Sequence, residues 1–443
     1  MNTLPNSLSK SSLPIIVVGA GAAGLSCAKM LQDAGQNVHI LEARSRLGGR
    51  IHSIQQQLSV FDLGASWIHG IQDNPIWEIT QRNRIKTTVF NYIEADFYHT
   101  GGRLFSIEEK SVFLQYIAEI EKLLSISQAS NAALAIEQIL PKLKPQHQHF
   151  SKSQLDDLAR LYFERFANDP FATTLTQLCT HFNDFEGYFT GDEVIFPDGY
   201  MQLIDAIAQD IHIQCNVEIK EVIRHANHVE LIDQHGTKHL AKQVVLSIPL
   251  GVLKQQVIKF EPILPKYLNH AIENYGFGSF NKVFIELEQE LPLQKASKQQ
   301  QKSIFYFHDQ VCYNILDLFF VYQKPVYLFL FGGPQSKWID QNTDEAVWQQ
   351  IRTGLVDNFI DIPTSPKALH ITRWGSDPYS YGSFSFPLPE HNVMLSQAFQ
   401  QSIDQQLYFT GEHCHERFSG TVHGAYISGQ DTAQQILQDL TPK

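Results

Sequence analysis

Residues 13–50 read LPIIVVGAGAAGLSCAKMLQDAGQNVHILEARSRLGGR, and this stretch decides the fold. The apolar run at 15–18 is typical of a parallel strand that is buried on both faces. Residues 19–24, GAGAAG, follow at once with G-x-G-x-x-G spacing, and a helical pattern comes next. Residues 38–41 predict a second strand, which ends at Glu42.

This strand–turn–helix–strand unit predicts a dinucleotide-binding site. The helix N-terminus offers unpaired N–H groups and a partial positive charge to a diphosphate. Gly19 permits the tight turn, Gly21 lets the backbone approach the diphosphate, and Gly24 lets the helix pack close to the strand. Glu42 follows the glycines by roughly 20 residues, where a carboxylate binds the ribose hydroxyls and would repel the 2′-phosphate of NADP.

The composition limits the other possibilities. The chain has 443 residues, of which 43% are hydrophobic and 18% charged, and this suits two or three domains. The net charge of −12 argues against nucleic acid or anionic membrane as a partner, but it would attract a small cationic substrate. No run reaches about 18 apolar residues, so we expect no membrane span. Residues 1–12 are expected to be a disordered leader.

The five cysteines are scattered and odd in number. They show neither metal-ligand spacing nor a disulfide framework, so we expect no metal site. A reducing compartment, and hence a cytoplasmic location, is the simpler expectation.

Three further stretches place small residues beside charged or aromatic side chains. Residues 43–50, ARSRLGGR, put two glycines beside arginines and are interpreted as phosphate and flavin contacts; the alternative is a surface turn. Residues 61–70, FDLGASWIHG, form a small-residue loop that ends in Trp and His. Residues 408–426 combine a Gly-acid loop with the start of a last helix, whose N-terminus could meet a polar cofactor edge.

The pattern E-A-R-x-R-x-G-G-R at 42–50, followed by G-A-S-W-I-H-G at 64–70, resembles the flavin-containing amine oxidase family. Members of that family include polyamine oxidases, monoamine oxidases and histone lysine demethylases, and the W-I-H-G version is most similar to polyamine and spermine oxidases. The resemblance implies an α/β fold: a Rossmann-like FAD-binding domain of the GR2 type and a discontinuous α+β substrate domain.

The resemblance also implies a domain division, and the residue patterns themselves predict a set of strands. The FAD-binding domain would comprise 13–78, 190–260 and 400–443, with 79–189 as the helical part and 261–399 as the mixed-sheet part of the substrate domain. The residue patterns predict strands at 213–223, 280–287, 303–307, 316–321, 326–331 and 370–374, and a mobile loop at 291–302.

The family's cofactor is FAD, which would accept a hydride at N5 from an amine and so convert the amine to an imine. The imine would hydrolyse to an aldehyde, and O₂ would reoxidise the flavin to give H₂O₂. Monoamine oxidases tether their flavin through a cysteine of the closing motif. Cys414 lies two positions past Glu412, so we expect non-covalent FAD. The cofactor contacts that the resemblance implies are Gly19, Ala20, Gly21, Ala23, Gly24, Glu42, Arg44, Gly49, Arg50, Gly64, Ala65, Ser66, Trp67, Ile219, Trp374, Gly411, Glu412, Thr421, Val422 and Ala425.

Two side chains are candidates for the chemistry. Lys282 stands between Phe280 and Phe284 on a predicted strand, where partial desolvation would lower its pKa and allow proton exchange near neutral pH. In the family, the matching lysine holds a water against flavin N5; the alternative is a snorkelling lysine. The resemblance places His69 at the mouth of the substrate site for binding or proton handling, and the alternative is a buried histidine bonded to backbone.

The amine itself leaves several alternatives open. Trp374, Tyr379 and Phe384 could face the flavin or belong to the core, and Asp169, Asp184 and Glu186 are equal candidates to fix a distal nitrogen. An L-amino-acid oxidase would need an arginine clamp, for which Arg373 is the candidate. A non-catalytic flavoprotein that serves as a binding module is the third alternative. The sequence does not address the oligomeric state.

Overall fold

The computed structural model describes residues 13–56, 59–90, 95–99, 101–144, 148–180, 187–291, 303–356, 362–389 and 394–441. The predicted leader lies outside these ranges, as does the predicted loop at 291–302 apart from Leu291.

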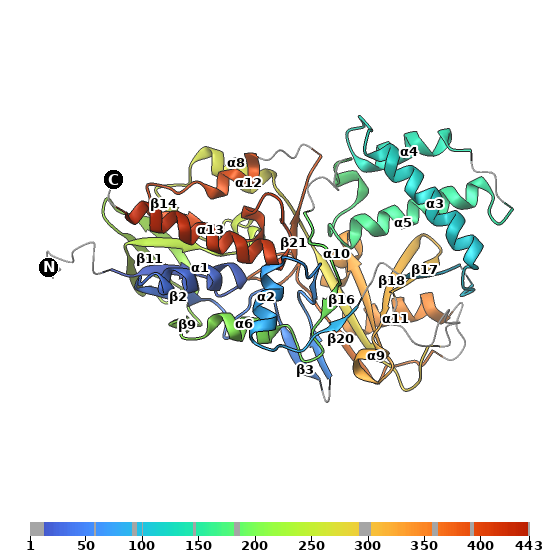
Figure 1. Ribbon diagram of the computed structural model, residues 1–443, viewed down its shortest axis with the longest axis horizontal. Coiled ribbons are helices and arrows are strands. Elements are labelled where there is room, and N and C mark those ends of the chain that lie inside the picture. The colour runs from blue at the N-terminus through green and yellow to red at the C-terminus, as the bar shows by residue number, and fades with distance from the viewer. Residues whose placement is uncertain are drawn as a thin grey trace.

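A five-stranded parallel sheet has the order β22-β13-β1-β2-β9. Its strands are β1 (Ile15–Val18), β2 (Val38–Glu42), β9 (Ile213–Cys215), β13 (Gln243–Leu246) and β22 (Leu407–Phe409). Successive residues of β1 contribute to two different core clusters, so both faces of this sheet are buried, as the apolar run predicts. Helices α1 (Ala22–Asp33) and α13 (Val422–Leu440) lie side by side (Figure 1), which brings the two ends of the chain together.

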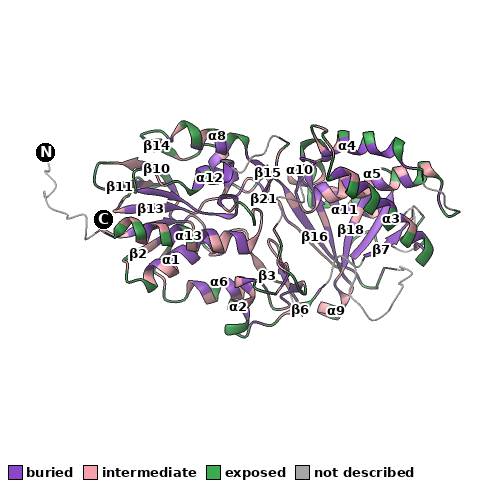
Figure 2. Ribbon diagram, turned by 45° about the horizontal axis from the view of Figure 1, so that its top comes forward, coloured by how far each residue is buried: buried purple, intermediate pink, exposed green. Residues whose placement is uncertain are grey.

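A six-stranded mixed sheet has the order β20-β16-β19-β18-β17-β7. Its strands are β7 (Ala95–Tyr98), β16 (Phe280–Glu286), β17 (Ser303–His308), β18 (Val311–Asp317), β19 (Val326–Gly332) and β20 (Ala368–Ile371). Figure 1 shows this sheet in a second lobe beside the parallel sheet, and Figure 2 shows the strands of both lobes largely buried.

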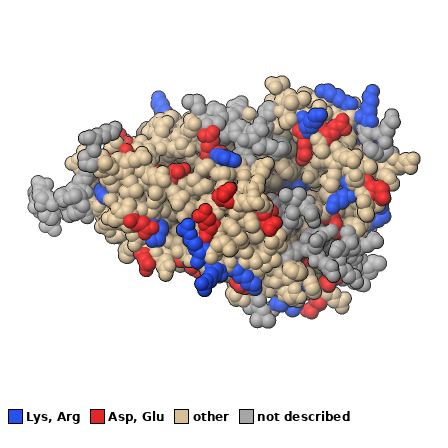
Figure 3. Space-filling model, viewed as in Figure 1, with Lys and Arg blue, Asp and Glu red and all other residues tan. Residues whose placement is uncertain are grey.

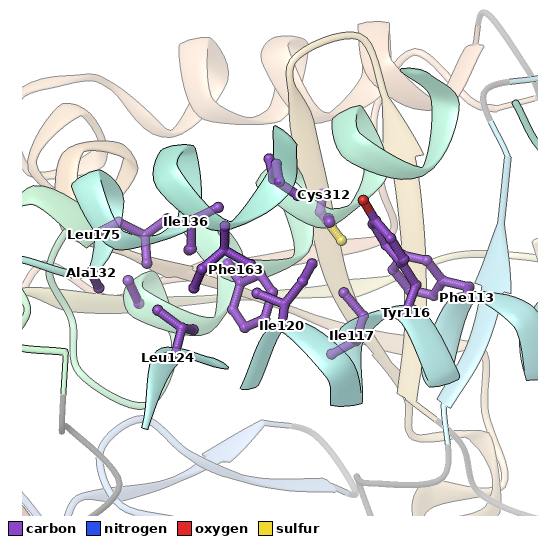
Figure 4. Close-up of a cluster of buried hydrophobic side chains, with 14 of the residues drawn as sticks. Phe113, Tyr116, Ile117, Ile120, Leu124, Ala132, Ile136, Phe163, Leu175 and Cys312 are labelled. Carbon is purple, nitrogen blue, oxygen red and sulfur yellow. The ribbon is translucent and has the colours of Figure 1, made fainter. Parts of the chain in front are cut away.

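Helices cover the two faces of the mixed sheet. On one face lie α3 (Ile107–Leu124), α4 (Ala132–Ile139) and α5 (Lys152–Asn168), whose apolar sides pack together and against Cys312 in a continuous cluster (Figure 4). Capping boxes at Ser106 and Ser151 begin α3 and α5, because each serine hydroxyl accepts from the third residue of its helix. On the other face lie α10 (Gly333–Gln341) and α11 (Asp344–Val356).

Shorter elements complete the described part of the chain. The strands are β3 (Ser53–Gln56), β4 (Ser59–Asp62), β5 (Trp67–Ile68), β6 (Thr88–Val89), β8 (Val194–Ile195), β10 (Ile219–Arg224), β11 (Val229–Asp233), β12 (Lys238–Ala241), β14 (Lys259–Glu261), β15 (Gly276–Gly278) and β21 (Phe384–Phe386). The helices are α2 (Pro75–Arg82), α6 (Met201–Ala208), α7 (Leu250–Lys254), α8 (Lys266–Asn274), α9 (Phe319–Tyr322) and α12 (Met394–Gln400), with 3-10 turns at Leu140–Lys142, Leu175–Gln177 and Glu412–Cys414.

The strand predicted at 316–321 is wrong. The chain turns at Asp309, whose φ of 48° is left-handed, so β18 begins earlier and ends at Asp317. The Asp317 carboxylate then accepts a hydrogen bond from the Phe319 amide at 3.0 Å and starts helix α9.

Two other strand predictions change in extent. The strand predicted at 213–223 is divided into β9 and β10, which belong to different sheets, because Asn216 has a left-handed φ of 61°. The strand predicted at 370–374 is β20, which ends at Ile371. The segment 79–189 is helical in α3 to α5, but it also contributes β6 and β7.

None of the helices in the described ranges combines the length and the hydropathy that a membrane span needs. On the face shown in Figure 3, acidic and basic side chains are interspersed.

Candidate functional site

The first glycine turn leaves an open space at one position. A Cβ on Gly19 would lie 2.4 Å from the Ser247 carbonyl oxygen, and one on Gly24 would lie 2.1 Å from the Gly19 oxygen, so both glycines are needed for packing. A Cβ on Gly21 would meet no atom within 4 Å. Gly21 is also the N-cap of α1 and supplies no side-chain cap. The helix N-terminus therefore faces a space that a diphosphate could fill.

Glu42 connects this turn to the second glycine loop. Its buried carboxylate accepts hydrogen bonds from the amides of Ala20 at 2.7 Å and Arg44 at 2.9 Å. The Gly48 amide donates to the Ala20 oxygen at 2.9 Å, and a Cβ on Gly49 would lie 3.6 Å from the Gly21 Cα. The predicted residues of the two loops are thus brought together, with Ala23 buried in the first turn of α1.

Two of the three arginines of the second loop, Arg44 and Arg50, are bound to distant segments. The Arg44 guanidinium donates to the Asp377 carboxylate at 2.6 Å and lies 5.1 Å from the Tyr379 ring centroid. The Arg50 guanidinium donates to the Glu412 carboxylate at 2.8 Å. Burial would raise the pKa of Glu412, but the Arg50 charge and hydrogen bonds lower the pKa overall. Glu412 therefore holds its charge inside the protein.

The closing motif meets the same region. Thr421 is the N-cap of α13: its hydroxyl accepts from the Gly424 amide at 2.9 Å and donates to the Phe418 oxygen at 2.8 Å. Val422 and Ala425, in the first turn of α13, pack against the core that α1 shares. Gly411, which follows β22, has a φ of 155°, and its amide donates to Ser428. The N-termini of α1 and α13, which the sequence singles out, therefore lie in the same lobe, the one that contains the parallel sheet.

Ile219 lies at the start of β10, beside the acid. The neighbouring Val217 amide donates to the Glu42 carbonyl oxygen at 2.9 Å. Ile219 and Val217 share a buried cluster with Leu41, the residue before Glu42.

Lys282 lies on β16 with its ammonium enclosed by the loop that follows β4. Its side chain is 4% exposed, and Nζ donates to the carbonyl oxygens of Asp62 at 3.0 Å and Gly64 at 2.6 Å, and to the Ser66 hydroxyl. Nζ also lies 5.2 Å from the Trp67 ring centroid. Burial lowers the pKa of Lys282, while the Asp62 carboxylate raises it in part.

The same loop is held from its other side by Trp374 and Arg50. The Trp374 indole donates to the Leu63 oxygen at 3.0 Å, and the residue is 7% exposed. The Ala65 amide donates to the Arg50 oxygen at 3.1 Å, and a Cβ on Gly64 would lie 1.8 Å from that oxygen. Loop 62–67 is therefore fixed between the mixed sheet and the glycine loops.

His69 pairs with an acid that the sequence did not single out. His69 Nδ1 lies 2.7 Å from the Glu193 carboxylate, and its side chain is 41% exposed. The His69 ring stacks on Trp67 with centroids 6.4 Å apart. Because 124 residues separate the two partners, no local pattern could reveal Glu193. Asp62, by contrast, lies within the quoted stretch 61–70, although no role was predicted for it from the sequence.

The remaining candidates for substrate binding either pair with other side chains or lie outside this group of contacts. Asp169 pairs with Arg165 at 3.0 Å and accepts from Asn314 at 2.8 Å, and Arg373 donates to the Asn342 oxygen and pairs with Asp344 at 2.6 Å. Asp184 and Glu186 lie outside the described residues. Phe384 packs near Phe280, with ring centroids 5.9 Å apart.

The buried ring of His413 should make the stability of the protein depend on pH. Neither ring nitrogen has a hydrogen-bond partner among the described residues, and the side chain is 1% exposed. Burial lowers its pKa from the ordinary 6.5 to about 4, so its contribution to stability is complete above pH 6.5 and is lost as the pH falls toward 4. Between pH 7 and pH 5, linkage gives a loss of about 2 kcal/mol.

His413→Leu should therefore reduce the loss of unfolding free energy between pH 7 and pH 5 by about 2 kcal/mol. Urea unfolding of wild type and variant at both pH values measures this difference. His235→Leu, at an exposed histidine, is the control and should keep the wild-type slope. A His413→Leu protein that loses stability as steeply as wild type would show that another group governs the acid response.

Comparison with known proteins gives a consistent result. The family model described as flavin containing amine oxidoreductase matches residues 22–437. Polyamine oxidase 4 of Oryza sativa subsp. japonica is 27% identical over 96% of this chain and 89% of its own length. Polyamine oxidase 2 of Arabidopsis thaliana is 28% identical with the same two coverages of 96% and 89%.

Proposed function

Because the chain belongs to the flavin containing amine oxidoreductase family, we propose that it oxidises a polyamine-like amine to an imine, which hydrolyses to an aldehyde. The protein is an amine oxidase, and its family uses FAD, typically bound non-covalently. When bound, FAD would supply the hydride acceptor for the amine α-carbon, and O₂ would be the final oxidant, reduced to H₂O₂. The similarity to polyamine oxidases supports the substrate class.

The residues present fit FAD. The open space at Gly21 suits a diphosphate at the α1 N-terminus, and the Glu42 carboxylate lies beside it for the ribose. In this proposal the parallel sheet is the Rossmann-like core of a GR2-type domain, and the mixed sheet belongs to the substrate domain. The buried Cys414 thiol, whose pKa burial raises, supports a flavin held without a covalent bond.

The observation that carries the proposal is the enclosed ammonium of Lys282, which lies against the loop next to the glycine turns. A buried amine with a lowered pKa can hold or release a proton near neutral pH. We propose that Lys282 Nζ handles the proton that accompanies the redox steps. The Ser66 hydroxyl is the partner through which that proton can leave the enclosed site.

We propose that His69 binds the incoming amine at the more exposed end of the site. An amine arrives as an ammonium ion, but hydride leaves only from its neutral form, so a base must accept one proton. Glu193 orients the His69 ring through Nδ1, and the half-exposed imidazole is the group that we propose accepts this proton. The Trp67 ring contacts both the His69 ring and Lys282 Nζ, which supports placing the two groups in one site.

A peroxide-coupled assay with purified protein tests this function. We expect H₂O₂ from spermine, spermidine or their acetyl forms, and none from simple monoamines or α-amino acids. Oxidation of amino acids alone would favour the L-amino-acid oxidase, although Arg373 is engaged by Asn342 and Asp344. If no amine gives H₂O₂ while the flavin stays bound, the result would favour a non-catalytic binding module. The five cysteines, all in the described ranges, form no disulfide with one another, which supports a reducing compartment such as the cytoplasm.

A further inference from the structure

The ammonium of Lys282 is fully hydrogen bonded by uncharged groups. It has three N–H donors, and these meet the Asp62 oxygen, the Gly64 oxygen and the Ser66 hydroxyl. All three acceptors come from one five-residue segment, 62–66. Dipoles alone compensate a buried charge poorly, so an ion of opposite sign is expected nearby. The Asp62 carboxylate raises the pKa of Lys282, and the backbone oxygen of the same residue accepts from Nζ.

The Asp62 carboxylate is itself held at a helix N-terminus. Oδ1 accepts from the Tyr200 amide at 3.0 Å and from the Ser53 hydroxyl at 2.5 Å. The Ser53 hydroxyl in turn accepts from the Met201 amide at 3.1 Å, at the first residue of α6. The positive end of α6 favours the anion. Asp62 is 7% exposed, so the carboxylate and these donors form a closed arrangement.

We propose that Asp62 is the positioning residue for Lys282: its carboxylate, anchored at the N-terminus of α6, fixes the segment that carries all three acceptors and supplies the counter-charge of the ammonium. The assignment rests on the proposed function in one respect, that Lys282 serves the flavin. Ser53, Asp62 and α6 then determine where that ammonium sits and how firmly it keeps its proton.

Other titratable groups around the pair do not provide this charge. Tyr200, the N-cap of α6, and Tyr322 on α9 stay neutral, because burial and then the Asp62 charge raise the pKa of each. His370 on β20 meets Phe61 edge-on at 6.2 Å, and burial lowers its pKa. The Tyr322 hydroxyl donates to the Val60 oxygen at 2.7 Å, so it supports strand β4 without adding charge.

The test is Asp62→Asn in the flavin-loaded protein. Asparagine keeps an oxygen for Tyr200 and Ser53 but removes the charge. With ¹³C-labelled lysine, NMR follows the Lys282 Cε resonance against pH, assigned by its loss in Lys282→Met. We expect its midpoint to fall by about one pH unit or more, a tenfold loss of proton affinity. Tyr322→Phe, which weakens the same strand without removing charge, should leave the midpoint unchanged.

An unchanged midpoint in Asp62→Asn, or an equal shift in Tyr322→Phe, would overturn the assignment. If Asp62→Asn does not fold, the reciprocal measurement replaces it, because coupling between two sites is symmetric. The midpoint of the Asp62 Cγ resonance should then rise by a similar amount in Lys282→Met, and constancy there would also overturn the assignment. Neither readout needs turnover. A protein that oxidises no amine but still shows the shift would refute the proposed function and leave the assignment of Asp62 as the positioning residue intact.

Discussion

Gly21→Val is expected to give a folded protein that holds no FAD. Gly21 has extended backbone, with φ −81° and ψ 179°, which valine adopts without strain. Its Cβ would point into space that is open to at least 4 Å, so the fold should tolerate the change. The valine methyl groups would instead fill the approach to the α1 N-terminus that the diphosphate needs.

The visible absorption spectrum and a thermal melt of the purified variant measure both parts of this expectation. We expect a cooperative melt near that of the flavin-free wild type and no flavin absorption, even after incubation with FAD. Gly24→Ala is the contrasting control: its Cβ would lie 2.1 Å from the Gly19 oxygen, so it should fail to fold normally. A yellow Gly21→Val protein with a full complement of flavin would place the diphosphate elsewhere.

Lys282→Met is expected to keep FAD and lose most of the catalytic rate. Methionine has a similar length and no N–H donors, so the site keeps its shape and loses its proton carrier. Groups of this kind contribute typically 10²–10⁴-fold, so flavin reduction, reoxidation or both should slow by roughly 10²-fold or more. Stopped-flow absorption measures the two half-reactions separately.

Lys337→Met, at an exposed lysine on α10, is the matched control and should keep wild-type rates in both half-reactions. If Lys282→Met also shows wild-type rates in both, Lys282 has no part in the mechanism. A variant that loses flavin would instead mean that the ammonium is needed to hold loop 62–67 in place.

The parts of the site that were predictable are local in sequence. The apolar run of β1, the glycine turn, helix α1 and Glu42 fall within one unit, where backbone geometry and short-range hydrogen bonds decide the structure. The start of the last helix, α13, was also predicted, because a Gly-acid loop directly precedes it. The burial of Lys282 followed from the aromatic residues on either side of it.

The unpredicted contacts join residues far apart in the chain. Glu193 reaches His69 across 124 residues, and Asp377 reaches Arg44 across 333, so only the folded arrangement brings these charges together. The misplaced strand at 316–321 has a different cause. Its apolar residues satisfy both a strand and a short helix, and the left-handed turn at Asp309 sets where β18 begins.

The central claim is that an amine is oxidised at a flavin held between the glycine turns and the loop around Lys282. The most direct test mixes the purified, FAD-loaded protein with spermidine or spermine without oxygen and follows the visible flavin absorption. We predict that the absorption bleaches and that admitting O₂ restores it with release of H₂O₂. A protein that stays colourless with added FAD, or a bound flavin that no amine bleaches, would contradict the account.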